Sequence, residues 1–289
     1  MTVIIGLVVV MLAVFGGFAL HGGKFGTIIA AAPFELLMIF GAGFGALIVA
    51  NSNLVFKQAL AGLGKTFKGS KWDQENYKEL LGLMFVLVKT MRTKGVVAVE
   101  GHIENPEDSK IFQHFSTVSA DHHVVEFIAD YMRMMTMNFE DPNQMEDAMN
   151  MDLERHHKEQ HEPVHALSVL GDGLPALGIV AAVLGVIKAM GAISEPVEIL
   201  GALIASALVG TFLGIFLSYT IVAPMAGRLG QIMEEESHFF NVVKVVLISY
   251  LHGNAPQIAV ELGRRNIPTH LQPKFLEIED FLSEIPPEL

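Results

Sequence analysis

Four long apolar runs, each nearly free of charged side chains, constrain this chain more than any other feature of its sequence. A helix needs about 20 such residues to cross the hydrocarbon core of a bilayer. Because backbone polar groups in lipid must pair within their own segment, we expect each run to be helical. The runs cover residues 1–20, 28–50, 173–193 and 199–222. The sequence therefore predicts an all-α integral membrane protein with four transmembrane helices in two pairs.

Composition supports this class and excludes several others. Only 17% of the residues are charged and 51% are hydrophobic, whereas a soluble domain carries about 25% charged residues. The absence of cysteine excludes disulfides, cysteine-ligated zinc, iron–sulfur clusters and thiol nucleophiles. A net charge of −12 argues against a nucleic-acid partner, which would require a basic face. The first basic residue, Lys24, follows the first run, so we expect that run to be a retained span and not a signal peptide.

Two charges interrupt the runs, and we expect both near span ends. Glu35 lies towards the start of the second run, where its carboxylate can reach the interface, and Lys188 lies towards the end of the third, where it can snorkel. We expect no acid or histidine in the middle of any span. A proton pathway normally needs a titratable group at that depth. If this protein moves protons, a partner must supply the carboxylate.

Basic residues outside the runs predict the orientation. Residues 51–172 hold 12 lysines and arginines and the segment from 225 onward holds 5, whereas the short connections are almost devoid of them. The positive-inside rule then places both termini and the long insert in the cytoplasm. The expected organisation is a first helical pair, a cytoplasmic helical domain, a second helical pair and a cytoplasmic helical tail. Their bounds are residues 1–50, 51–170, 171–224 and 225–289.

The polar segments carry helix signals of their own. Apolar residues recur at three and four positions from Glu75 to Met91, which predicts an amphipathic helix ending near Gly95. Asn105-Pro106 and Asp141-Pro142 each have the form of an N-cap followed by proline in the first turn, and each predicts a helix start. In the tail, we expect a helix over residues 229–251, breaks at Gly253, Pro256 and Gly263, and either a short acidic helix or a frayed end.

Residues 59–66 match the relaxed pattern of a phosphate-binding loop. Such a loop lies between a strand and a helix, but this segment leaves a predicted span and no strand precedes it. We therefore do not expect a nucleotide site. Gly62 and Gly64 are instead expected to relax the chain where it leaves the membrane.

The segment His161-Glu162-Pro163-Val164-His165 matches the zinc-protease pattern, and His157 extends it at the same spacing. Pro163 lies between the two candidate ligands and disturbs the helical geometry that would align them. Solvated histidines on a helix are the preferred interpretation, with no metal and no catalytic residue. A membrane-embedded metalloenzyme is the alternative from a different functional class.

Small residues form the strongest pattern in the spans. They recur at every fourth position of the fourth run and give that helix a smooth flank, which favours close helix packing in lipid. The third run carries small residues as well. The flank consists of Ala202, Ser206, Gly210, Gly214 and Ser218.

Two prolines mark the cytoplasmic ends of the same two runs. Pro175 and Pro224 each remove a backbone hydrogen bond if the helix continues through them, which leaves a free carbonyl and a hinge. If the third span begins only at Asp172, Pro175 is merely a favourable first-turn residue. Thr211 places a hydroxyl in the middle of the fourth run.

Four separated segments resemble the MotA family of flagellar stator proteins. They are GDGLPALGIVAAVLGV (171–186), LGALIASALVGTFLGI (200–215), VEGHIENPEDSKIF (99–112) and APQIAVELGRR (255–265). They occur in the family's order, and the resemblance covers nearly the whole chain. The sister ExbB/TolQ proteins share the ion-driven mechanism but have three spans and no such insert, so an energy-transducing subunit of that kind is a less suitable alternative.

The resemblance implies a bacterial inner-membrane protein without cofactors and without enzyme activity. Proteins of this family form a pentamer around the transmembrane helices of two MotB chains, whose aspartate carries the ion. Ion flow is thought to rotate the pentamer and so push the rotor protein FliG. A partner that brings the aspartate agrees with the expected lack of an intramembrane acid in this chain.

The resemblance also implies roles for single residues. The family's rotor-facing charges fall on Arg92 and Glu100, its two functional prolines on Pro175 and Pro224, and its channel-side threonine on Thr211. Sodium-driven relatives carry a second threonine at the position of Ala182. Because alanine offers no hydroxyl to an ion, the resemblance implies a proton-type stator.

Overall fold

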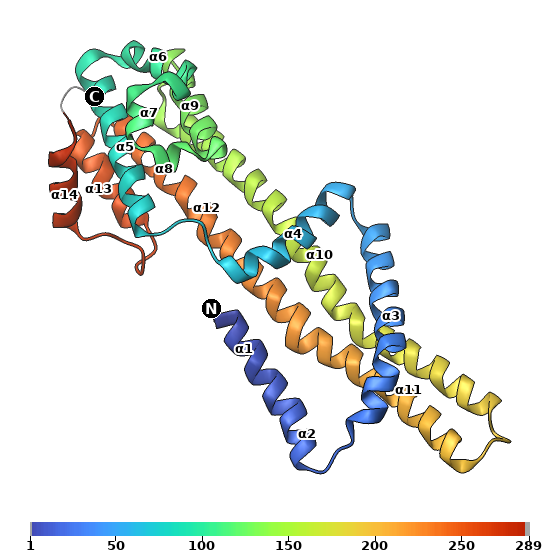
Figure 1. Ribbon diagram of the computed structural model, residues 1–289. Helices are drawn as coiled ribbons and strands as arrows, with labels where there is room; N and C mark the ends of the chain where they lie inside the picture. Colours follow the sequence, from blue (N-terminus) through green and yellow to red (C-terminus); the bar gives the residue numbers. More distant parts are fainter. Residues whose placement is uncertain (1, 287–289) are drawn as a thin grey trace. The chain divides into compact units, whose positions relative to one another are not determined.

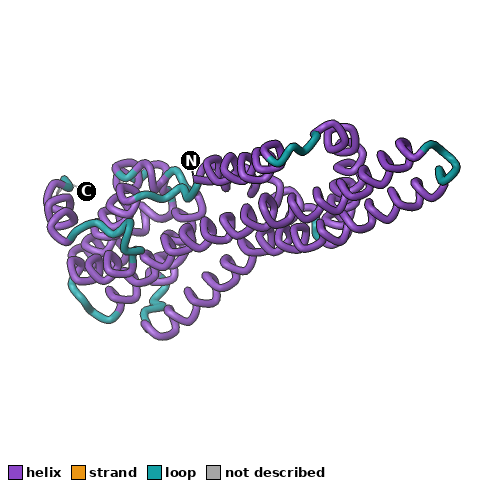
Figure 2. Tube along the Cα trace, turned by 90° about the horizontal axis from the view of Figure 1, so that it is seen from below, coloured by secondary structure: helices purple, strands orange, loops and turns teal. Residues whose placement is uncertain are grey.

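The computed structural model describes residues 2–286, and helices with short connections account for all regular structure in that range (Figure 2). Four continuous helical stretches, some of which contain more than one of the elements named below, are long and apolar enough to cross a membrane, as expected. They are Thr2–Leu20, Phe25–Ala50, Pro142–Gly191 and Val197–Leu251. The chain divides into two compact units. Unit 1 comprises residues 1–69 and 159–232, and unit 2 comprises residues 70–158 and 233–289.

Unit 1 contains the apolar helices. Its α3 and α11 pack against each other, and α4 contacts both α1 and α3 (Figure 1). The elements that lie within it are α1 (Thr2–Met11), a π-helix η1 (Leu12–Gly16), α2 (Gly17–Leu20), α3 (Phe25–Ala50), α4 (Asn53–Lys68), α11 (Val197–Leu217) and a π-helix η4 (Ser218–Val222).

Unit 2 is built from shorter helices around an apolar core. The elements that lie within it are α5 (Gln74–Lys94), η2 (Val96–Val99), α6 (Glu100–Glu104), η3 (Pro106–Asp108), α7 (Lys110–His114), α8 (Ser116–Ser119), α9 (His122–Thr136), α13 (Pro256–Asn266) and α14 (Phe275–Glu284). Two long helices, α10 (Pro142–Gly191) and α12 (Ala223–Leu251), contribute residues to both units.

The core of unit 2 forms around α5, whose middle is almost wholly buried. Trp72, which precedes this helix, stacks on Phe239 with ring centroids 4.0 Å apart, and the Tyr77 ring lies 5.0 Å from the same phenylalanine. Asp73 caps α5 through the backbone N–H of Asn76 at 3.0 Å. The helix expected from Glu75 to Met91 is therefore confirmed, and it ends at Gly95, whose φ of +89° suits glycine.

Two expectations about glycine are wrong, and one alternative for a proline is excluded. Gly62 and Gly64 lie inside α4 and do not loosen the chain, because Gly62 packs tightly against Leu229. Gly263 does not break the tail, because α13 continues through it and the missing side chain admits Val246. Pro175 is not a first-turn residue, because α10 begins at Pro142 and is helical on both sides of it.

Candidate functional site

Two helices of unit 1 approach each other so closely that their backbones touch. A Cβ placed on Gly178 of α10 would lie 2.8 Å from the carbonyl oxygen of Gly210 and 3.0 Å from the Cα of Gly214 in α11. Further along, Gly185 lies in the same way against Ala207. Glycine at these positions allows the contact, since any side chain would strike backbone atoms.

The five small residues on the predicted flank of α11 and η4 do not share one environment. Ala202 is exposed and Ser206 is half-buried, whereas Gly210, Gly214 and Ser218 are buried. The hydroxyl oxygen of Ser218 is enclosed and has no hydrogen-bond partner among the described residues. The close contact with α10 therefore uses the middle of the flank, and its first two residues remain accessible.

The two functional prolines expected from the sequence lie inside continuous helices. Pro175 is half-buried within α10. Pro224 is exposed and follows the five-residue π-helix η4 directly, at the second position of α12. A π-helical turn before a proline is one of the recognised ways in which a helix accommodates the lost backbone bond. Sequence reasoning predicted the proline hinge but had no signal for the π-helical turn.

Thr211 and Ala182 lie on the paired helices α11 and α10, and both are half-buried. Each follows a close-packed neighbour, since Gly210 precedes Thr211 and the buried Ala181 precedes Ala182. A built Cβ on Gly210 would lie 3.3 Å from the Cβ of Ala181. Thr211 and Ala182, the positions expected along the ion pathway, therefore lie next to a contact between α10 and α11.

Glu35, which the sequence analysis places towards the start of the second span, is a buried acid within α3. The helix α3 begins at Phe25, before the apolar run itself, so ten residues and about 15 Å of helix precede Glu35. The residue is only 4% exposed, and its Oε2 atom has no hydrogen-bond partner among the described residues. The sequence analysis identified Glu35 but not its burial, because a single acid in a long run does not show which face of the helix carries it.

The charges assigned to the rotor contact lie in unit 2 and are both exposed. Arg92 is in the last turn of α5, and its Nη1 donates a hydrogen bond to the carbonyl oxygen of Gly253 at 3.3 Å. Glu100 is the first residue of α6, where a carboxylate faces the positive end of the helix dipole. The two residues lie on either side of the short 3₁₀ helix η2.

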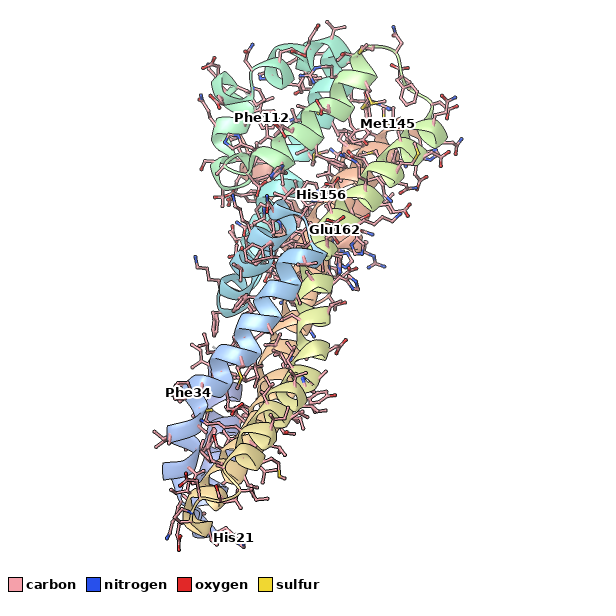
Figure 3. The ribbon with its side chains drawn as sticks, turned by 90° about the vertical axis from the view of Figure 1, so that its right-hand side faces the viewer. His21, Phe34, Phe112, Met145, His156 and Glu162 are labelled. Carbon is pink, nitrogen blue, oxygen red and sulfur yellow. The ribbon has the colours of Figure 1, made fainter. Side chains whose placement is uncertain are left out.

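The histidine motif lies in a helix that Pro163 does not interrupt. Since α10 continues through it, His161 and His165 occupy positions one turn apart, with His161 half-buried and His165 exposed. Within unit 2, His157 Nδ1 lies 3.7 Å from Glu234 Oε2. Figure 3 labels Glu162 and His156 on the same helix. Pro163 therefore lies inside a continuous helix and does not end it. Residues 59–66 are helical in α4, so they do not form the phosphate-binding loop either.

Comparisons with known proteins agree along nearly the whole chain. Residues 4–95 match the model of the motility protein A N-terminal family, and residues 119–241 match that of the MotA/TolQ/ExbB proton channel family. Motility protein A of Escherichia coli is 40% identical over 99% of this chain and 96% of its own length. The chemotaxis protein LafT of Vibrio parahaemolyticus is 35% identical over 97% of this chain and 98% of its own length.

Two solved structures share the fold. The C. jejuni MotAB structure matches with a TM-score of 0.70 at 20% identity, covering 100% of this chain and 98% of that one. The flagellar MotAB stator complex from Bacillus subtilis matches with a TM-score of 0.64 at 24% identity, covering 89% and 92%. Fold and comparisons together define the class, which is a multi-pass inner-membrane protein of the MotA/TolQ/ExbB type. Within that class, the chain belongs to the motility protein A family of flagellar stator subunits.

Proposed function

We propose that this chain is the ring-forming subunit of an ion-driven flagellar stator, with no enzymatic activity of its own. The observation that carries the proposal is its likeness to motility protein A of Escherichia coli, at 40% identity across 99% of the chain. The match includes both the apolar helices and the polar insert. The glycine contacts between α10 and α11 support it further, because they give a rigid pair of spans against which another helix can move.

The partner in the membrane is a MotB-type protein with one span and an ion-carrying aspartate. The structures that share this fold contain MotA together with MotB, which supports the pairing. We propose that five copies of this chain surround the spans of two partner chains. Thr211 and Ala182 then lie along the ion pathway, and Pro175 and Pro224 act as its hinges.

The polar unit is the proposed torque-transmitting part. Both termini and unit 2 lie in the cytoplasm in this proposal, as the distribution of basic residues predicts. Arg92 and Glu100 are exposed there and are available to charges on the rotor protein FliG. Surface charges of this kind steer an encounter and set its register more than they add affinity.

The coupling ion is a proton in this proposal, because Ala182 offers no hydroxyl where sodium-driven relatives carry one. One elementary charge crossing 100 mV releases about 2.3 kcal/mol. That energy is sufficient for a small conformational step.

The experiment is expression of this chain with its candidate partner in a motile strain that lacks its own stator genes. We expect co-purification with a one-span protein bearing an intramembrane aspartate, and swimming whose speed is unchanged when sodium is removed. Loss of swimming without sodium would contradict the proton assignment. Normal assembly with a partner that has no intramembrane acid would contradict the stator function.

A further inference from the structure

Glu35 is a buried acidic side chain of unit 1 that the proposed mechanism does not use. Glu35 is buried in α3, packed against α11, and its Oε2 has no hydrogen-bond partner among the described residues. An ionised carboxylate in such surroundings is strongly disfavoured unless it is paired, so a buried acid there requires an explanation.

Packing places the carboxyl group of Glu35 against the backbone of Gly210. A Cβ built on Gly210 would lie 2.5 Å from Glu35 Oε2 and 3.2 Å from its Cδ. The carboxyl group of Glu35 therefore occupies the space that the Cβ of any other residue at position 210 would fill. This contact places the carboxyl group between α3 and α11.

Beside this contact lies a cavity of about 640 Å³, which Glu35 helps to line. Its volume far exceeds the ~30 Å³ that one water molecule occupies in the liquid. The walls come from the first half of α3, the last turns of α10 and the first turns of α11, so the cavity lies towards the short connections between spans. Figure 3 shows His21 at one of these connections and Phe34, a wall residue, further along α3.

The polar groups in the cavity suit a proton better than a metal ion. The lining residues offer the carboxyl of Glu35, the hydroxyls of Thr27 and Ser206, and the amino group of Lys188. A bare cation needs about six oxygen ligands, and the lysine would repel it. A proton needs one acceptor oxygen. Among the described residues, Lys188 on α10 is the one other titratable group that lines the cavity.

We propose that Glu35 is a proton-binding residue on the non-cytoplasmic side of the pathway. A hydronium ion in the cavity gives its proton to the Glu35 carboxylate, which leaves a neutral carboxylic acid against Gly210 and one water molecule. The reverse transfer returns the proton to a water molecule and leaves the Glu35 carboxylate. This inference rests on the proposed ion-driven function, and it adds a second carboxyl group to the one that the partner supplies.

The first test compares Glu35→Gln with the control Glu198→Gln, in the complex with the native partner. Glutamine keeps the size of the side chain and removes its titration, and Glu198 is an exposed carboxylate in the first turn of α11. In the reconstituted complex, infrared spectroscopy should show a carboxylic-acid C=O band that the E35Q variant loses and the E198Q variant keeps. Survival of this band in E35Q would overturn the inference, whether or not the complex drives rotation.

Motor speed against external pH gives a second readout. We expect E35Q to rotate roughly tenfold more slowly than the wild type when external protons are scarce, and the gap to narrow as the medium is acidified. Wild-type speed at every pH would overturn the inference and leave the stator function intact. Absence of proton flux in the wild-type complex itself would instead contradict the proposed function.

A third measurement needs no variant, which protects the test if E35Q fails to assemble. A hydrophobic carbodiimide attaches to protonated carboxyl groups in apolar surroundings. In the wild-type complex, peptide mass spectrometry should find the adduct on Glu35 and not on Glu198, with less adduct as the pH rises. Labelling of Glu198 without labelling of Glu35 would overturn the inference.

Discussion

Gly178 and Gly214 meet backbone to backbone, so that a Cβ on Gly214 would lie 2.8 Å from the Cα of Gly178 and 2.7 Å from the carbonyl oxygen of Leu174. Neither contact is with a side chain that could turn away. We therefore expect Gly214→Ala to force α10 and α11 apart at a cost of about 1–3 kcal/mol, as overpacking does in other closely packed interiors. The measure is the unfolding temperature of the purified chain in detergent. The control is Gly201→Ala on the same helix, where a new Cβ meets nothing within 4 Å. Equal unfolding temperatures for the two variants would contradict the contact.

Gly210 provides a graded comparison on the same helix. Its built Cβ approaches Glu35 Oε2 at 2.5 Å, but that atom is the end of a flexible side chain that can shift. We therefore expect Gly210→Ala to lower the unfolding temperature less than Gly214→Ala does. Adding Glu35→Ala should remove most of the Gly210→Ala effect, because the two changes act on one contact. Strict additivity of the two effects would show that the carboxyl group does not occupy this space.

Asp121 gives unit 2 a predictable response to acid. Burial alone would raise the pKa of this carboxyl group, but the hydrogen bond and charge of Lys71 outweigh it and hold the pKa below the ordinary value of 3.8. Because the pKa is lower in the folded state, the stabilisation is present above the ordinary value and is lost as the pH falls through the folded value.

The variant Asp121→Asn isolates this charge, since asparagine still caps α9 at the N–H of Val124. We expect it to cost less than about 1 kcal/mol at neutral pH, because Lys71 is 42% exposed. The gap from the wild type should close below about pH 4. The single tryptophan, Trp72, reports unfolding through its fluorescence. A gap that widened on acidification would contradict the sign.

Arg264 is a buried cation that stabilises the end of the tail. Its side chain is 7% exposed, and it donates two hydrogen bonds to Glu261, at 2.6 and 2.7 Å, and one to the carbonyl oxygen of Pro273 at 2.9 Å. We expect Arg264→Leu to destabilise unit 2 by up to about 3 kcal/mol, less than for a fully buried pair because Glu261 is 31% exposed. The neighbouring Arg265 is exposed, so Arg265→Leu is the matched control. Similar unfolding temperatures for the two variants would exclude this role.

Two similar sequence signals show how far local reasoning extends. Asp141-Pro142 does begin a helix, because Asp141 Oδ1 accepts from the backbone N–H groups of Asn143 and Gln144 at 2.9 and 3.0 Å. Asn105-Pro106 has the same form, yet Asn105 makes no capping bond and only a 3₁₀ turn follows. There Ser109 is the cap, and the helix begins at Lys110. Whether a residue caps a helix depends on the backbone angles of its neighbours, and the pattern of side chains in the sequence does not give those angles.

The candidate site shows the same limit at the level of packing. Hydropathy alone located all four apolar helices, because the requirement to satisfy the backbone in lipid acts on every residue of a span. It could not assign Glu35 to a buried face, since burial depends on which helix packs against α3. The stripe of small residues predicted close contact but not its partner. The structure shows that Gly210 faces both Ala181 and Glu35.

Charge reversal at Arg92 tests the proposed rotor contact. Arg92→Glu places a like charge where the rotor is expected to present acidic groups, and such a juxtaposition costs several kcal/mol. We therefore expect at least a roughly tenfold loss of stator occupancy at the motor, measured with a fluorescent fusion, together with reduced torque on a tethered bead. Because Arg92 also donates to Gly253, Trp72 fluorescence must first show that unit 2 is folded. Reversal of Lys110, an exposed lysine on α7 outside the proposed contact, is the matched control. A compensating charge change in FliG should restore part of the torque of R92E. Full torque from R92E alone would remove Arg92 from the contact.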